Sequence, residues 1–141
     1  MAKKVNNIAT DFERLKTVLV VEQDEATRKS AVFLLQLRNV NVLSAGSVKE
    51  AMLIWQEHRD EVDLILTDQF IQEDDAGKKM LEIMWLDRPN LRAILTCVNE
   101  IKDDPWMEKH QVDFVPKPFP RNYLLHKVEW MLKQAHTVNT A

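Results

Sequence analysis

Side chains that can bind a metal ion or a phosphoryl group follow four of the apolar segments in this chain. They are Glu22, Gln23 and Asp24 after the first segment, Asp68 after a second, and then Thr96 and Lys117. Carboxylate and other oxygen ligands hold divalent cations such as Mg²⁺, and an aspartate can be the nucleophile that accepts a phosphoryl group. A lysine and a hydroxyl can bind the phosphoryl oxygens. If these side chains meet, the chemistry they predict is phosphoryl transfer.

Each of these residues also has a purely structural interpretation. Asp24 is placed to cap a helix, Asp68 has the position of a turn residue or cap, Thr96 is an ordinary strand residue, and Lys117 is an ordinary loop lysine. Taken singly, each is better explained this way. Their joint placement at the ends of successive strands favours a common site, because ligands of open α/β sheets bind at the carboxyl ends of the strands.

The elements that must position these residues alternate along the chain. Strands are expected over residues 17–21, 40–45, 62–67, 93–96 and 112–115. Helices are expected to begin near Asp24, at the capping box of residues 47–50, at Gly77, at Asp104 and Pro105, and after Pro120. Five strands that alternate with five helices predict an α/β fold with a doubly wound five-stranded parallel sheet. This is a three-layer α/β/α sandwich of the flavodoxin-like type.

The composition predicts one domain with its own core. The chain has 141 residues, 45% of them hydrophobic, and a net charge of −3. We expect the domain over residues 17–135, an N-terminal extension or linker over 1–16 and a C-terminal tail over 136–141. No apolar run has the length of a membrane span or of a secretory signal, so a cytoplasmic location is expected. Scattered basic residues argue against a nucleic-acid-binding surface.

The cysteine and glycine counts exclude several other kinds of site. The single Cys97 excludes an internal disulfide and a cysteine-based zinc site, and it fits a reducing cytoplasm. Gly46 and Gly77 are the only glycines, so neither a P-loop nor a dinucleotide fingerprint can be built.

The segments around the strand ends resemble the receiver domains of two-component response regulators, of the kind found in chemotaxis regulators. The matching stretches lie at residues 18–22, 63–68, 94–97 and 114–119, and the resemblance extends from about Thr17 to Lys133. The most specific match is the Lys-Pro-Phe sequence that follows the last short strand. The chain would be either a stand-alone regulator or a receiver cut from a hybrid histidine kinase or multidomain regulator.

The resemblance implies a role for each residue of the site. Asp68 would accept a phosphoryl group from a histidine kinase or a phosphotransfer protein. Thr96 would bind the phosphoryl oxygens, and Lys117 would pair with them. The Lys117–Pro118 peptide bond would be cis. Phe114 would be the switch aromatic, the ring that turns inward on activation. Mg²⁺ would be held by a set made up of Glu22, Gln23, Asp68 and the backbone carbonyl of Phe70.

Gln23 departs from the pattern of the family. The family usually has two adjacent acids after the first strand, and the second of them binds the metal directly. A neutral amide removes one negative charge, which weakens Mg²⁺ binding. The alternative function is therefore a pseudo-receiver that serves as a constitutive protein-docking module, although the presence of Asp68, Thr96 and Lys117 argues against it.

The expected activity is signalling by protein contact, not catalysis on a separate substrate. The face built from the fourth helix, the fifth strand and the fifth helix is expected to change partners, and homodimerisation is left open. A stand-alone phosphatase is disfavoured, because Phe70 stands where a second acid would be needed. The cognate kinase and the pathway are not encoded in any recognisable motif.

Overall fold

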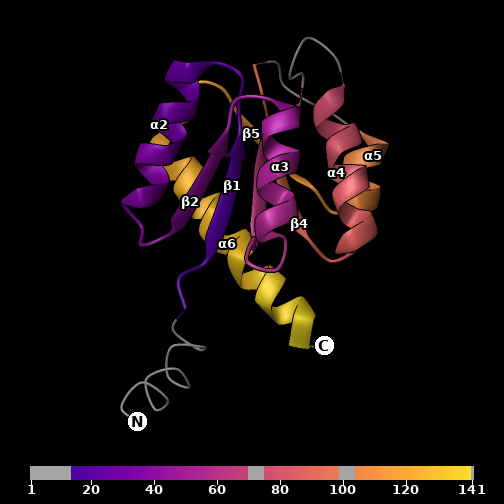
Figure 1. Cartoon of the computed structure of the whole chain (residues 1–141). Coiled ribbons are helices and arrows are strands. Elements are labelled where there is room, and N and C mark those ends of the chain that lie inside the picture. The colour runs from indigo at the N-terminus through magenta and orange to yellow at the C-terminus, as the bar shows by residue number, and fades with distance from the viewer. Residues whose placement is uncertain (1–13, 70–74, 99–103, 141) are drawn as a thin grey trace.

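A central β-sheet carries helices on both of its faces (Figure 1). The computed structural model of the protein describes residues 14–69, 75–98 and 104–140, and side chains as far as residue 133. Five parallel strands form one sheet in the order β2-β1-β3-β4-β5. They are β1 (Thr17–Val21), β2 (Asn41–Ala45), β3 (Leu64–Asp68), β4 (Arg92–Cys97) and β5 (Asp113–Pro116). This confirms the doubly wound α/β class.

Five helices in the described part of the chain connect and cover the strands. They are α2 (Glu25–Gln36), α3 (Val48–His58), α4 (Ala76–Asp87), α5 (Pro105–His110) and α6 (Arg121–Thr140). In Figure 1, α3, α4 and α5 lie on one face of the sheet, and α2 and α6 lie on the other. Because all strands are parallel, their carboxyl ends share one edge, and β1, β3 and β4 end next to one another there.

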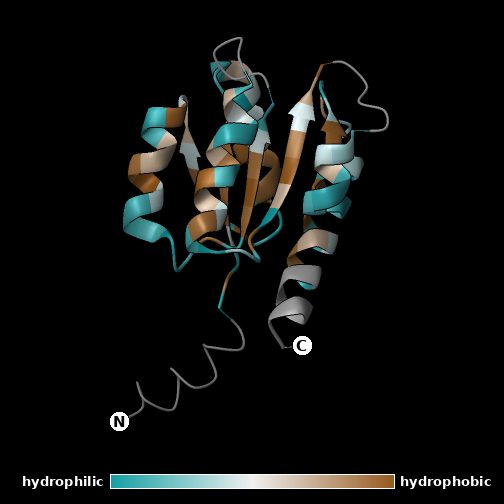
Figure 2. Ribbon diagram, turned by 90° about the vertical axis from the view of Figure 1, so that its right-hand side faces the viewer, coloured by the Kyte–Doolittle hydropathy of each residue, from teal (hydrophilic) through white to brown (hydrophobic). Residues whose placement is uncertain are grey.

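The core has two layers because the central strands are buried on both faces. Every residue of β1 is buried, and its side chains alternate between the layers. Leu19 and Ile65 pack with α3 and α4, whereas Val20 and Leu66 pack with α2 and α6. Figure 2 shows the central strands mainly in the hydrophobic colours and the helices in mixed colours. These strands read as continuous apolar runs for this reason.

Three helices begin at capping residues that the sequence indicates. Asp24 accepts a hydrogen bond from Thr27 N at 2.9 Å, Ser47 accepts one from Glu50 N at 3.1 Å, and Asp104 accepts one from Trp106 N at 2.9 Å with Pro105 in the first helical position. Each cap satisfies an amide that has no partner inside the helix. These caps lie at the edge of the sheet formed by the carboxyl ends of the strands, and they set the direction in which each helix runs away from that edge.

The element boundaries differ from the sequence-based expectations in a few places. The apolar Leu37 is 48% exposed, because it is the C-cap of α2 and lies beyond the last full turn. β5 includes Pro116, which an edge strand tolerates. The backbone of α6 continues to Thr140, into the segment expected to be a tail. Among the described residues, no helix has both the length and the apolar character of a transmembrane segment.

Candidate functional site

Asp68 is the last residue of β3, the central strand, at the edge formed by the carboxyl ends of the strands. Its Cα is in register with that of Thr96 on β4, and Gln69 N donates a hydrogen bond to Thr96 O at 3.0 Å. The Asp68 side chain is 14% exposed, and Thr96 is buried. The two residues are therefore held on adjacent strands, at the same height and with limited access to water.

Lys117 brings the ends of β1, β3 and β5 together. Its Nζ lies 2.8 Å from Glu22 Oε1 and 3.2 Å from Asp68 Oδ2. Lys117 N also donates to Cys97 O at 2.9 Å, which ties the end of β5 to the end of β4. The Lys117–Pro118 peptide bond is cis, as expected. One ammonium group thus bridges two carboxylates from different strands.

The charge of Lys117 is maintained by this bridge. Burial by itself lowers the pKa of Lys117, but the hydrogen bond and charge of Glu22, together with Asp68, outweigh it and raise the pKa above its ordinary value. Lys117 is therefore a full cation at neutral pH. A fixed cation beside Asp68 is suited to stabilise negative charge that arrives on that carboxylate.

Glu22 is engaged through both of its carboxylate oxygens. Oε1 pairs with Lys117, and Oε2 accepts a hydrogen bond from Asp24 N at 3.0 Å. Its side chain is 4% exposed. The backbone carbonyl of Glu22 accepts from Arg28 Nη1 at 2.7 Å, and that of Gln23 accepts from the same atom at 3.3 Å. The loop after β1 is therefore fixed from three directions.

Asp24 does not replace the missing acid. Its carboxylate caps α2 through Thr27 N and Thr27 Oγ1, and these hydrogen bonds hold the pKa of Asp24 below its usual value. Gln23 is exposed. Within the described ranges, no group of three or more His, Cys, Asp or Glu side chains is arranged to hold a metal ion. Oxygen donors that suit a hard cation are still present at this edge, in Glu22, Asp68 and the Gln23 amide. They carry one negative charge fewer than a site with two adjacent acids after β1.

Gly77 allows α4 to begin directly against the end of β3. A Cβ at Gly77 would lie 2.4 Å from the Asp68 carbonyl oxygen and 3.1 Å from that of Gln69. No side chain fits in this space, so the first turn of α4 packs on the backbone of Asp68. Reasoning from the sequence named neither Gly77 nor Arg28 as part of the site. The rarity of glycine in this chain is the signal that could have identified Gly77.

The remaining residues expected at the site have different outcomes. Phe114 is half-buried on β5 and packs against the core layer of α3 and α4. Phe70, expected to offer its carbonyl to the metal, lies outside the described residues. Asp68, Glu22 and Lys117 meet in direct contact, and Thr96 lies beside them in register.

The family model of the response regulator receiver domain matches residues 18–129. The chain belongs to this family. This receiver is 34% identical over 136 residues to the sensor kinase CckA of Brucella abortus (strain 2308), and the match covers 94% of the chain but 14% of that relative. The chain thus spans about one-seventh of the length of this curated relative.

Solved receiver structures share the fold. A CheY-like receiver from Methanospirillum hungatei JF-1 has a TM-score of 0.74 at 22% identity and covers 87% of this chain and 98% of its own. The receiver domain of the hybrid histidine kinase CckA has a TM-score of 0.69 at 26% identity, and the match covers 82% of this chain and 98% of that one. The chain is therefore a receiver domain of a two-component system, a signalling domain of a class that generally binds Mg²⁺ and interacts with histidine kinases or other partners.

Proposed function

We propose that this receiver accepts a phosphoryl group on Asp68 from a histidine kinase or a phosphotransfer protein. The contact of Lys117 with both Glu22 and Asp68 carries this proposal. A domain that served only as a docking module would have no physical need for a buried cation between two carboxylates. Taking charged groups out of water is costly, and a buried ion pair often adds little net stability, so stability alone does not explain this arrangement.

The chain's own residues provide most of the chemistry. An Asp68 carboxylate oxygen attacks the phosphorus of a phosphohistidine, an acyl phosphate bond forms, the P–N bond breaks, and the imidazole leaves. Lys117, already 3.2 Å from Asp68 Oδ2, pairs with the incoming phosphoryl oxygens. Thr96, in register with Asp68, offers its hydroxyl to another of these oxygens.

Mg²⁺ would be held by Glu22, Gln23, Asp68 and the Phe70 carbonyl. When bound, it supplies positive charge to the phosphoryl oxygens. Gln23 makes this set less anionic, and Glu22 must share its oxygens with Lys117 and Asp24 N. We therefore expect phosphorylation to need a higher Mg²⁺ concentration than in a receiver with two acids at this loop.

The second candidate function is the pseudo-receiver, which Gln23 favours. In that case the metal site is too weak for phosphorylation, and the domain binds its partner constitutively. Gln23→Asp separates the two functions, because it restores the missing carboxylate at an exposed position and leaves the contacts of Lys117 unchanged.

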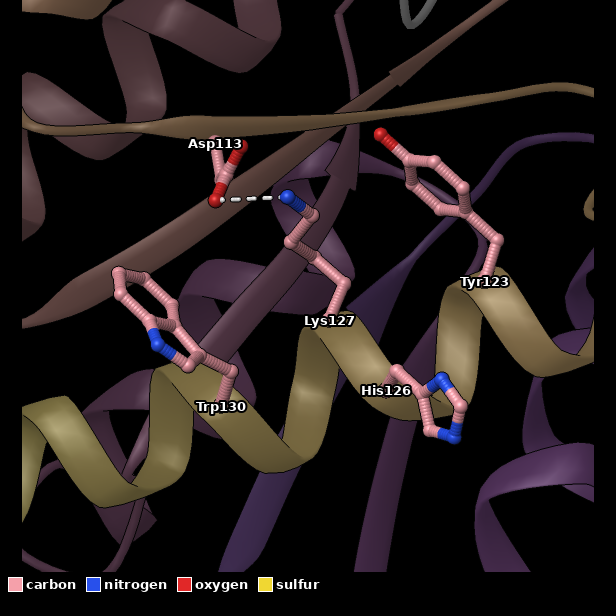
Figure 3. Close-up of a pocket in the computed structure, with 5 residues that line it drawn as sticks. All are labelled: Asp113, Tyr123, His126, Lys127 and Trp130. Atoms are coloured by element: carbon pink, nitrogen blue, oxygen red, sulfur yellow. Dashed lines mark ion pairs between the residues drawn. The ribbon is translucent and has the colours of Figure 1, made fainter.

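We further propose that the face of α5, β5 and α6 exchanges partners, where α5 and α6 are the fourth and fifth helices of the alternating pattern. A cavity of about 450 Å³ opens on this face, lined by Asp113, Tyr123, His126, Lys127 and Trp130. Figure 3 shows the Tyr123 and Trp130 rings on α6 on either side of Lys127, which pairs with Asp113 at 3.2 Å. Exposed aromatic rings beside charged groups are typical of protein interfaces. A homodimer through this face is also compatible with these features.

The test is intact-protein mass after incubation with acetyl phosphate, with and without Mg²⁺. We expect the native chain to gain one phosphoryl group in the presence of Mg²⁺ and Asp68→Asn to gain none. A native chain that gains nothing while Gln23→Asp is phosphorylated would establish the pseudo-receiver instead. No gain in either protein would refute phosphoryl acceptance altogether.

A further inference from the structure

Helix α5 is held in place by few buried side chains. It has six residues, Pro105–His110, and Met107 is its one buried residue. A short helix with little buried surface has low local stability, so the contacts of its other side chains decide its position. Those contacts are made chiefly to α4, which lies next to it (Figure 1).

The first contact is an ion pair at the amino end of α5. Lys78 Nζ lies 2.7 Å from Asp104 Oδ2, and the two side chains are 14% and 16% exposed. The other oxygen of Asp104 accepts the hydrogen bond from Trp106 N that caps α5. The hydrogen bond from Lys78 also holds the pKa of Asp104 below its usual value. One carboxylate therefore both starts α5 and ties it to α4.

The second contact is a cluster of three aromatic rings. The His110 ring stacks on Trp85 with centroids 4.5 Å apart and an interplanar angle of 13°, and it lies 4.9 Å from the Trp106 ring. Trp85 is itself fixed, because its Nε1 donates to Leu91 O at 2.9 Å. Lys78 Nζ lies 5.0 Å from the centroid of Trp106, within the range of a cation–π contact. Lys78 thus contacts both the Asp104 carboxylate and the Trp106 ring, and so connects the ion pair to the ring cluster.

Lys78 is also connected to the phosphoacceptor. It follows Gly77, and the backbone of Gly77 packs on the Asp68 carbonyl. The same turn of α4 therefore contacts the Asp68 backbone and reaches the cap of α5. A displacement at the end of β3 would therefore act on this turn, and through it on the contact between Lys78 and Asp104.

We propose that the Lys78–Asp104 ion pair and the Trp85–His110–Trp106 rings form a latch that holds α5 against α4 in the unphosphorylated protein, and that its opening carries a change at Asp68 to the face of α5, β5 and α6. The switching part of this inference rests on the proposed function. The holding part does not, because it concerns the unphosphorylated chain.

The test is amide hydrogen exchange in α5, at residues 106–110, in the full chain. Lys78→Met removes the cation, and Asp104→Asn removes the charge but keeps a good capping residue. Lys79→Met is the matched control, because Lys79 lies on the same turn and is exposed. We expect both latch variants to exchange about tenfold faster than the native chain, as loss of a charged hydrogen bond predicts. The double variant should match the single ones, since both remove the same pair.

Latch variants that exchange within about twofold of the native chain, or no faster than Lys79→Met, would overturn the latch. Phosphorylation of the native chain should also speed exchange in α5, and it should add little in Lys78→Met. Unchanged exchange in a chain whose mass shows that it is phosphorylated would overturn the switching part. A chain that takes up no phosphoryl group by mass refutes the proposed function and the switching role, while the exchange rates still decide whether the latch holds α5.

Discussion

Replacing Lys117 with methionine should destabilise the protein through the two carboxylates that the ammonium bridges. Lys117 contacts Glu22 at 2.8 Å and Asp68 at 3.2 Å, and the three side chains are 13%, 4% and 14% exposed. Breaking a buried ion pair from one side costs about 3–5 kcal/mol. Partial exposure and the remaining hydrogen bond from Asp24 N to Glu22 reduce this, so we expect a loss of about 2–4 kcal/mol.

The assay is equilibrium urea unfolding at pH 7, followed by tryptophan fluorescence. Lys127→Met is the control: its ammonium lies 3.2 Å from Asp113, the same distance as from Lys117 to Asp68, but the side chains are 26% and 32% exposed. A pair of this exposure contributes about 0.2–1 kcal/mol. The two substitutions remove the same group, so the difference between them reports the combined effect of burial and of the second carboxylate that Lys117 contacts.

A second substitution separates charge from packing. In a Lys117→Met background, Glu22→Gln should recover part of the lost stability, because the amide no longer buries an unpaired charge. The reasoning is refuted if Lys117→Met lowers the free energy of unfolding no more than Lys127→Met does. It is also refuted if Glu22→Gln lowers the stability of the Lys117→Met protein by as much as it lowers that of the native chain.

Three further predictions follow from single positions. Gly77→Ala should lower the free energy of unfolding in urea by about 1–3 kcal/mol, because its Cβ would lie 2.4 Å from the Asp68 carbonyl oxygen. Gly46→Ala should cost less, because its Cβ would meet only the flexible side chain of Arg28. Equal losses for the two variants would contradict this explanation. Gln111→Gly should stabilise the protein by about 0.5–1 kcal/mol, since Gln111 has φ 56° in the left-handed region, and a loss of stability would contradict it. Because the pKa of Lys117 is raised in the folded protein, its contribution to stability is fully present below the pKa of the unfolded state, about 10.4. That contribution is lost as the pH rises through the pKa of the folded state. The stability difference between the native chain and Lys117→Met should therefore be constant from about pH 7 to 9 and shrink above about pH 10.4, and shrinkage below pH 9 would show that the sign is wrong.

The sequence was sufficient to predict the fold and the meeting of Asp68, Glu22 and Lys117. Both depend on strong local patterns: continuous apolar strands, capping residues, and polar residues directly after the strands. A parallel sheet then brings residues that lie far apart in the chain to one edge.

The rest depends on distances between elements, which no local pattern encodes. The sharing of Glu22 between Lys117 and Asp24 N is a matter of side-chain placement across three segments. His110 stacks on Trp85, which belongs to a different helix, and nothing in the local sequence around His110 indicates this contact. The packing of Gly77 on Asp68 follows from how closely α4 approaches β3.

The central claim, that Asp68 is the residue that carries the phosphoryl group, is tested most directly by locating that group. The native chain and Asp68→Asn are treated with acetyl phosphate and Mg²⁺ and then with borohydride, which reduces an aspartyl phosphate to homoserine, and the peptides are sequenced by mass spectrometry. We predict homoserine at position 68 in the native chain and nowhere in Asp68→Asn. A reduced acidic residue at any other position, or the same labelling in both proteins, would contradict the account.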